Sequence, residues 1–111
     1  MNITRGDYKK IKFQRKNMNN EIITDKPDKM YFTIKNNEYT KDVLIQKTFE
    51  NGITFTEEYY YVIEILPKDT DNLSYGKYYF DIEIIINGKP KTIKIDEFNI
   101  TKEITFTTNE V

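Results

Sequence analysis

The strongest constraint on this chain is a run in which every second residue is apolar, from Tyr78 to Ile86. A period of two places these side chains on one face of a strand and scatters them around a helix. Asn87-Gly88 follows directly, and this pair accepts the positive φ angles of a two-residue hairpin turn. The pattern predicts a β-hairpin formed by residues 76–86 and 91–98.

The rest of the chain repeats this theme. It has 17 Ile and 13 Thr but only three Leu and no Ala, so β-branched residues greatly outnumber good helix formers. We therefore expect an all-β fold, an immunoglobulin-like antiparallel β-sandwich of seven or eight strands, in one domain spanning residues 1–111. Ile11 and Phe13 are expected to point inward. The other strands are expected at residues 8–14, 21–24, 30–34, 43–49, 53–55, 59–65 and 100–106, with a bulge near Glu97.

Residues 68–75 are expected to form one short helical turn, capped by Asp69 or Thr70 and ended by Gly76. Tyr78 follows this connection near the start of the next strand. A tyrosine in that place resembles the tyrosine corner of immunoglobulin-like sandwiches, whose hydroxyl bonds back to the loop backbone. Calcium binding by Asp69 and Asp71 is the weaker alternative, because the loop lacks enough regularly spaced oxygen ligands.

The first seven residues allow two interpretations. Arg5-Gly6-Asp7 matches the integrin-binding tripeptide, but a three-residue match is weak, and a turn at the entry to a strand explains it better. Met1–Asp7 could alternatively form an arm that lies on a neighbouring subunit.

Composition argues against several classes of function. The chain has no His and no Cys, so it lacks the usual general base, the Ser-His and Cys-His pairs and the common transition-metal ligands. We predict no enzymatic activity, no cofactor and no metal. Its net charge of −1 argues against nucleic acid as a partner, and no apolar run is long enough for a membrane span or a signal peptide. Paired carboxylates of the glycosidase type remain only formally available, among Asp25, Asp28, Glu57, Glu58, Asp81 and Glu83.

Several of the nine tyrosines must reach the surface. Ordinary strand packing is the first interpretation, and a protein interface is the second, because tyrosine offers a flat apolar ring and a polar tip. Sugar stacking is the third, and Tyr31, Tyr60 and Tyr79 would then form a carbohydrate-binding module for host attachment.

Six segments resemble a family of small virion structural proteins from phages of low-GC Gram-positive bacteria. They are ITRGD at 3–7, KFQRK at 12–16, KPDKMYFTIK at 26–35, IQKTFENGI at 45–53, PKDTDNLSYGKYYFDIEI at 67–84 and KTIKIDEFNIT at 91–101. The chain is also similar to the N-terminal module of upper-baseplate proteins, which attaches a receptor-binding assembly to the tail. Such domains commonly have a glycine before the F-x-I motif, where this chain has Asp96-Glu97.

This resemblance implies a virion protein, assembled in the host cytoplasm, whose partners are the major capsid protein or tail and baseplate proteins. Because the sequence ends at Val111 without a coiled coil or receptor-binding region, we expect a capsid decoration protein, with a tail or baseplate subunit as the alternative. It could also be a homo-oligomer, and an intracellular phage regulator is the remaining hypothesis. The expected interface residues are Asn2, Ile3 and Arg5 in the N-terminal segment, and Asn19, Asn20, Asn37 and Tyr39 in the loops at 17–20 and 36–39.

Overall fold

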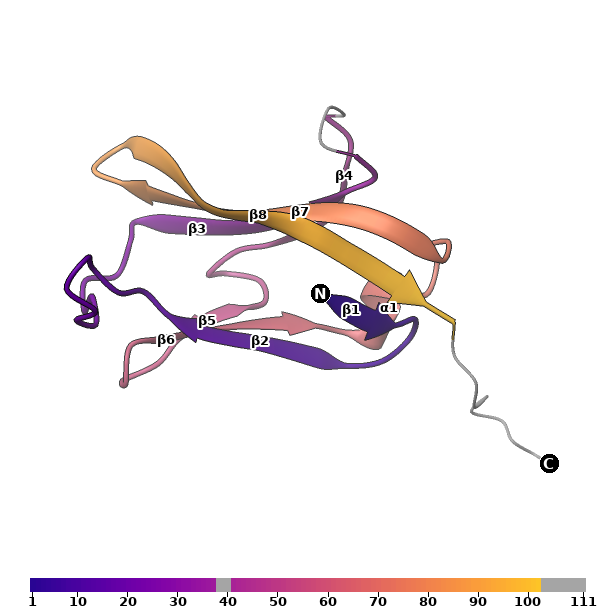
Figure 1. Cartoon of the computed structure of the whole chain (residues 1–111), viewed down its shortest axis with the longest axis horizontal. Helices are drawn as coiled ribbons and strands as arrows, with labels where there is room; N and C mark the ends of the chain where they lie inside the picture. Colours follow the sequence, from indigo (N-terminus) through magenta and orange to yellow (C-terminus); the bar gives the residue numbers. More distant parts are fainter. Residues whose placement is uncertain (38–40, 103–111) are drawn as a thin grey trace.

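The structure, a computed structural model, describes residues 1–37 and 41–102 and places them in two packed sheets (Figure 1). The five-stranded sheet has the order β1-β8-β7-β3-β4, and the three-stranded sheet has the order β2-β6-β5. The elements are β1 (Asn2–Thr4), β2 (Lys9–Gln14), β3 (Lys29–Lys35), β4 (Val43–Lys47), β5 (Ile53–Phe55), β6 (Tyr60–Ile65), α1 (Pro67–Thr70), β7 (Gly76–Ile86) and β8 (Lys89–Thr101).

The strand order is that of an immunoglobulin-like sandwich, as the sequence predicts. In the usual lettering, β2, β5 and β6 correspond to strands B, D and E, and β3, β4, β7 and β8 correspond to C, C′, F and G. The short β1 occupies part of the position of strand A and pairs in parallel with the end of β8. All other strand pairs are antiparallel.

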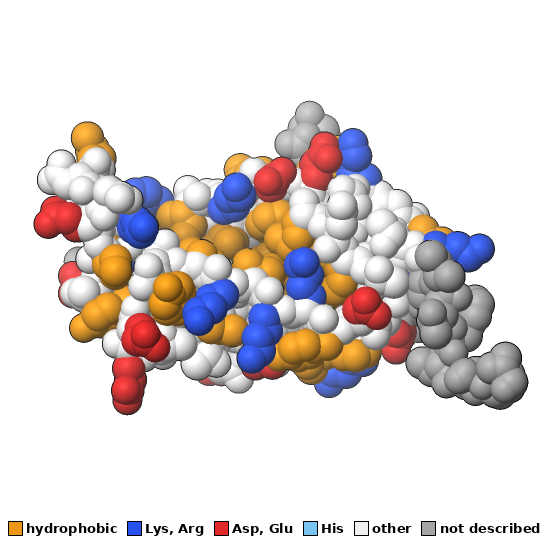
Figure 2. All heavy atoms as spheres, turned by 60° about the horizontal axis from the view of Figure 1, so that its bottom comes forward, with side chains coloured by type: hydrophobic (Ala, Val, Ile, Leu, Met, Phe, Trp, Pro, Cys, Tyr) orange, Lys and Arg blue, Asp and Glu red, His pale blue; other side chains and the backbone are white. Residues whose placement is uncertain are grey.

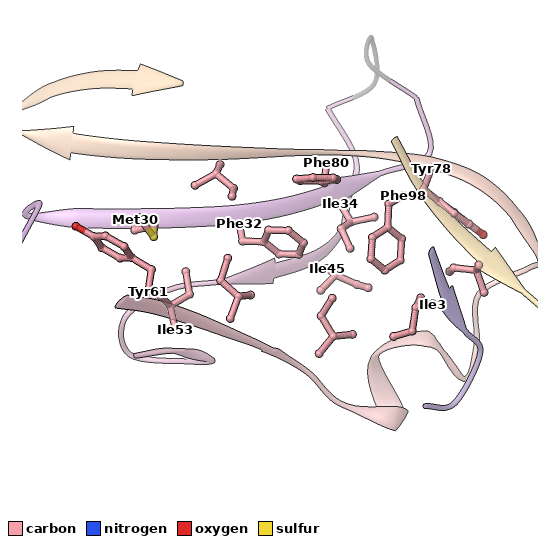
Figure 3. Close-up of a cluster of buried hydrophobic side chains, with 14 of the residues drawn as sticks. Ile3, Met30, Phe32, Ile34, Ile45, Ile53, Tyr61, Tyr78, Phe80 and Phe98 are labelled. Atoms are coloured by element: carbon pink, nitrogen blue, oxygen red, sulfur yellow. The ribbon is translucent and has the colours of Figure 1, made fainter. Parts of the chain in front are cut away.

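The core lies between the two sheets, and β7 forms its centre. The inward residues of β7 from Tyr78 to Ile84 are buried, as the alternating pattern predicts, and they face buried residues of β6 (Figure 3). Phe32 of β3 contacts Phe80 of β7, with ring centroids 5.4 Å apart. This aromatic pair fills the middle of a sandwich that has no disulfide to join its sheets.

The predicted hairpin is confirmed, but its bulge lies elsewhere than expected. Asn87 and Gly88 have φ angles of 52° and 75°, as the tight turn requires. The register of β7 and β8 shifts where Ile82 pairs with Lys94 and Glu83 pairs with Thr92, which leaves Ile93 as the extra residue. The prediction of a bulge near Glu97 is therefore wrong. The extra residue at Ile93 lets both Ile93 and Phe98 point toward the core side.

Three local predictions need correction or lie outside the description. Residues 21–24 form no strand, because after the turn at 17–20 only an isolated bridge links Lys16 to Ile22. Neither Asp69 nor Thr70 is the N-cap of α1: the helix starts at Pro67, and Leu66 precedes it. Of the expected strand at 100–106, residues 100 and 101 belong to β8, and residues 103–106 lie outside the described part.

The crossing from β6 to β7 contains the hydrogen bond expected of a tyrosine corner. The buried Tyr78 hydroxyl donates to the Ser74 carbonyl oxygen at 2.7 Å, four residues upstream. The bond ties the start of β7 to the loop that leads into it. The fully buried Tyr61 hydroxyl provides a contrast, because it has no hydrogen-bond partner among the described residues.

Because only one of these two hydroxyls is hydrogen-bonded, replacing each tyrosine with phenylalanine should affect the free energy of unfolding differently. Tyr78→Phe should lower the free energy of unfolding by about 1 kcal/mol, because the Ser74 carbonyl loses its donor. Tyr61→Phe should leave the free energy of unfolding unchanged or raise it, because it removes a buried hydroxyl without a hydrogen-bond partner among the described residues. Urea unfolding followed by circular dichroism measures both, and equal losses in the two variants would contradict the assignment.

Candidate protein-binding site

The predicted interface loops lie at opposite ends of the sandwich. Residues 17–20 precede β3, and Asn37 follows it, so the length of that seven-residue strand, roughly 20 Å, separates them. Asn19 and Asn20 belong to an exposed turn in which the Asn17 side chain accepts hydrogen bonds from the Asn19 and Glu21 amides. Asn37 is exposed, and Tyr39 lies outside the described residues. The structure therefore does not gather these residues into one surface.

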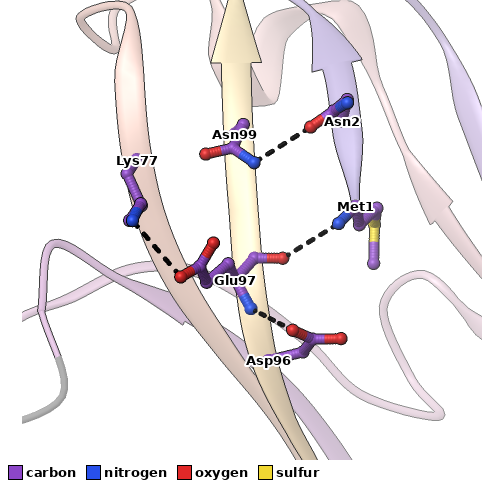
Figure 4. A network of polar contacts seen from close by, with 6 residues as sticks. All are labelled: Met1, Asn2, Lys77, Asp96, Glu97 and Asn99. Carbon is purple, nitrogen blue, oxygen red and sulfur yellow. Dashed lines mark hydrogen bonds and ion pairs between the residues drawn. The ribbon is translucent and has the colours of Figure 1, made fainter.

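The N-terminal segment belongs to the sandwich and does not extend away as an arm. Asn2, Ile3 and Thr4 pair with Asn99, Ile100 and Thr101 of β8. Figure 4 shows the Met1 amino group bonded to the Glu97 carbonyl at 3.2 Å and the Asn99 side chain bonded to that of Asn2 at 2.9 Å. Ile3 is only 4% exposed, so the prediction that it contacts a partner is corrected: its side chain packs in this chain's own core.

The predicted interface residue Arg5 contacts the loop between α1 and β7. Its guanidinium lies 4.3 Å from the centre of the Tyr75 ring and donates a long hydrogen bond of 3.5 Å to the Leu73 carbonyl. The next residue, Gly6, has a φ of 83°, and its amide donates to the buried Thr70 hydroxyl at 2.8 Å. The Arg5-Gly6-Asp7 tripeptide is thus a turn that joins the chain start to α1, as the structural interpretation predicts.

Asp69 is engaged in a buried ion pair. Its carboxylate lies 2.7 Å from the Lys47 ammonium and accepts a 2.7 Å hydrogen bond from the Leu66 amide. The Lys47 side chain is only 6% exposed, and its stem runs past Gly52, where a Cβ would come within 2.6 Å. Since Lys47 neutralises Asp69, this carboxylate holds α1 against β4. No cluster of metal-binding side chains occurs among the residues described.

The three tyrosines considered for sugar binding do not share a surface. Tyr31 and Tyr79 lie on the outer face of the five-stranded sheet, whereas Tyr60 belongs to β6 in the other sheet and has the Lys12 ammonium 4.3 Å above its ring. Tyr31 pairs with Glu83 of β7, and Glu83 lies four residues, or roughly 13 Å, from Tyr79 along that strand. All three side chains are half-buried. The structure therefore offers no single platform built from them.

The outer face of the same sheet carries Asp81, whose pKa is shifted. Partial burial disfavours the charged carboxylate and raises the pKa of Asp81, while Lys35 opposes the shift. Asp81 borders a shallow hollow together with Tyr79 and Ile95, and Ile95 is 66% exposed. Two of the carboxylates considered for glycosidase chemistry, Asp81 and Glu83, thus alternate on a solvent-facing surface of β7.

A groove of about 460 Å³ runs along the seam between β2 and β8 and is termed here the seam groove. Figure 2 shows apolar side chains exposed in a hollow on this face. The apolar side chains that line it come from the N-terminus, β2, the segment after β2, β7 and β8. They are Met1, Ile11, Phe13, Ile23, Phe80, Ile82 and Ile93.

Basic side chains surround this apolar floor (Figure 2). They are Arg15 and Lys16 beside β2, and Lys91 and Lys94 on β8. Lys94 lies 3.7 Å from Asp96, whose pKa is lowered chiefly by a hydrogen bond from the Glu97 amide. The other three have no ion pair with a described residue, so the rim attracts negative charge.

The sequence predicts part of this groove but not its opening. Ile11 and Phe13 point inward as expected, yet both remain half-buried and line the groove. The opening arises because β1 pairs with only three residues of β8, Asn99 to Thr101. The part of the seam beside residues 89–98 of β8 is therefore not covered by a described strand.

Comparisons with known proteins found no matching family model, no similar curated protein and no similar solved structure. The fold and the surface described above are therefore the observations on which a function rests, and the resemblance to virion proteins stays a hypothesis. No helix in the described residues is long and apolar enough to cross a membrane.

Removing one member of the Lys47–Asp69 pair should destabilise the protein strongly. Asp69→Asn leaves the Lys47 ammonium buried without its counter-charge and should lower the free energy of unfolding by about 3 kcal/mol. Adding Lys47→Met should recover much of this loss, because the buried charge is then gone. Chemical unfolding of both variants tests this.

The exposed Lys77–Glu97 pair supplies the control. Its atoms lie 3.3 Å apart and both side chains are about half exposed, so Lys77→Met should change stability by no more than about 0.5 kcal/mol. If the double variant at 47 and 69 is no more stable than Asp69→Asn alone, the unpaired ammonium is not the cause of the loss.

The raised pKa of Asp81 predicts that the difference in free energy of unfolding between the wild type and Asp81→Asn depends on pH. A carboxyl whose pKa is raised on folding binds its proton more tightly in the native state, so it favours folding at low pH and this contribution is lost as pH rises through the folded pKa. Asp81→Asn should therefore be more stable than the wild type at pH 7, with the gap closing in acid. Unfolding curves over a pH series test this, and a gap independent of pH would contradict it.

Proposed function

We propose that this protein is a non-enzymatic structural subunit of a phage particle that acts by binding other proteins, with the outer surface of the capsid as its location. The observation that carries the binding role is the seam groove, an apolar floor with a basic rim on a small immunoglobulin-like domain. Large apolar patches on small domains are typical of interaction surfaces.

The phage setting comes from the resemblance of the six segments named above. In the structure, the segments at 26–35 and 67–84 contain β3, α1 and most of β7, including the Tyr78 corner. They are therefore the residues that form the centre of the sandwich. The proposed partners are the major capsid protein or, for the alternative location, tail and baseplate proteins.

The arrangement of polar side chains favours binding over catalysis. Asp69 is paired with Lys47, and Asp28 accepts a 2.8 Å hydrogen bond from the Asn87 amide, so each of these carboxylates has a structural task. Asp81 and Glu83 lie on an open strand face. A catalytic carboxylate pair needs two groups that converge on one enclosed substrate.

The test is the distribution of the protein between heads and tails. Particles of the producing phage are separated on a density gradient into heads and tails, and the protein in each fraction is quantified by mass spectrometry against the major capsid protein. A copy number that scales with the capsid protein supports decoration, because a decorating protein occupies equivalent positions on the lattice.

A few copies in the tail fraction alone would move the protein to the tail or baseplate and overturn the capsid location. Absence from both fractions would overturn the structural role altogether. Unassembled protein in the lysate, removed by the gradient, serves as the control for adventitious adsorption.

A further inference from the structure

The seam groove is bordered by two strand edges that no described strand pairs. β2 is the end strand of the three-stranded sheet, and β8 pairs with β1 only from Asn99 to Thr101. The remainder of β8, from Lys89 to Phe98, has no strand on that side among the described residues. Open edges of this kind are templates for pairing with another strand.

The backbone of β8 is oriented for such pairing. Toward β1, the Glu97 carbonyl accepts from the Met1 amine, the Asn99 amide donates to the Met1 carbonyl, and the Thr101 carbonyl accepts from the Arg5 amide. Because backbone groups alternate along a strand, the next residue of this set, Ile95, directs its N–H and C=O to the same side. A strand added in line with β1 would meet these groups.

The floor of the groove supplies the side-chain contacts that strand addition needs. The inward side chains of β2 and β7 reach it from opposite sheets, and Ile23 and Ile93 lie at its sides. An added strand that pairs with β8 would turn every second side chain onto this floor and the others to solvent. Apolar residues at alternate positions would therefore be selected.

The rim selects the charge of that strand. Arg15, Lys16, Lys91 and Lys94 bring four positive side chains to one groove, and the Met1 amino group lies at its end. Asp96 lies beside this rim as a counter-charge and pairs with Lys94. Acidic side chains on the incoming strand would meet this basic rim and be steered toward it.

We propose that the seam groove binds an extended strand of a partner protein, with apolar residues at alternate positions and acidic residues between or beside them, and that this strand pairs with the free edge of β8. The strand would complete the position that β1 fills only in part. The inference rests on the proposed protein-binding role and names the class of partner segment for that site.

The test uses the full chain and short synthetic peptides. The probe peptide has isoleucine alternating with glutamate and threonine. One control peptide has lysine in place of each glutamate, and a second has N-methylated backbone amides on the side that would face β8. Binding is measured by isothermal titration calorimetry, and we expect heat from the probe but none from either control.

Two double variants of the protein distinguish binding in the seam groove from a general effect of net charge. Lys91→Glu with Lys94→Glu should weaken binding of the probe by about tenfold or more, because the rim changes sign beside the added strand. The matched control is Lys29→Glu with Lys68→Glu, which makes the same change in net charge at exposed residues that do not line the groove. That control should bind the probe within about twofold of the wild type.

Hydrogen exchange locates the bound peptide. Saturating probe should slow amide exchange at Ile95 of β8, since its N–H faces the open side and would enter a new ladder. The proposal is overturned if no probe binds, if the lysine peptide binds equally well, or if protection appears in β2 and not in β8. A concentration-dependent dimer that displaces the probe would identify a second copy of this chain as the occupant and would overturn the partner-protein assignment.

These outcomes are independent of the particle experiment. If the protein is present in heads but the probe does not bind, the strand-binding inference fails and the virion role stands. If the probe binds but the protein is absent from particles, the virion role fails and the groove remains a strand-binding site.

Discussion

The ladder between β1 and β8 is only three residues long, and this limit shapes one whole side of the molecule. An immunoglobulin-like sandwich has to close the seam between its second and last strands, and the first strand usually does so. Here β1 pairs only with Asn99–Thr101 of β8, and the Gly6 turn, whose amide bonds to Thr70, then directs the chain toward α1. The seam is closed over Ile3, and beside residues 89–98 of β8 no described strand covers it, so apolar side chains of both sheets line the seam groove there.

The end of the sandwich near α1 is held by polar contacts in place of a disulfide. Lys47 reaches from β4 to Asp69, and the Tyr78 hydroxyl reaches back to Ser74. Each contact joins a strand of the five-stranded sheet to the crossing from β6 to β7. These contacts fix the crossing, and among the described residues that line the seam groove there is no comparable buried ion pair. The end held by these polar contacts and the open groove are thus different regions of the sandwich.

Much of the fold could be predicted because alternation is a local property. The inward face of β7, the Asn87-Gly88 turn and the Tyr78 corner each depend on residues close in sequence, and all three match the structure. The predictions that fail depend on distant partners. Residues 21–24 have strand-like composition but meet only a short stretch of chain after β2. Ile3 was expected at an interface as part of an N-terminal arm, because its pairing with Ile100 joins residues far apart in the sequence.

The sequence by itself determined the class of fold, since a period of two in apolar residues can be buried only by strands packed in layers. It also placed Lys47 in an expected strand at 43–49 without indicating what would neutralise its charge. Only the tertiary structure brought Asp69 to that ammonium, buried Ile3 and left the seam between β2 and β8 open. The physical reason is that edge pairing and charge pairing join residues far apart in the chain, and their geometry exists only once both sheets are packed.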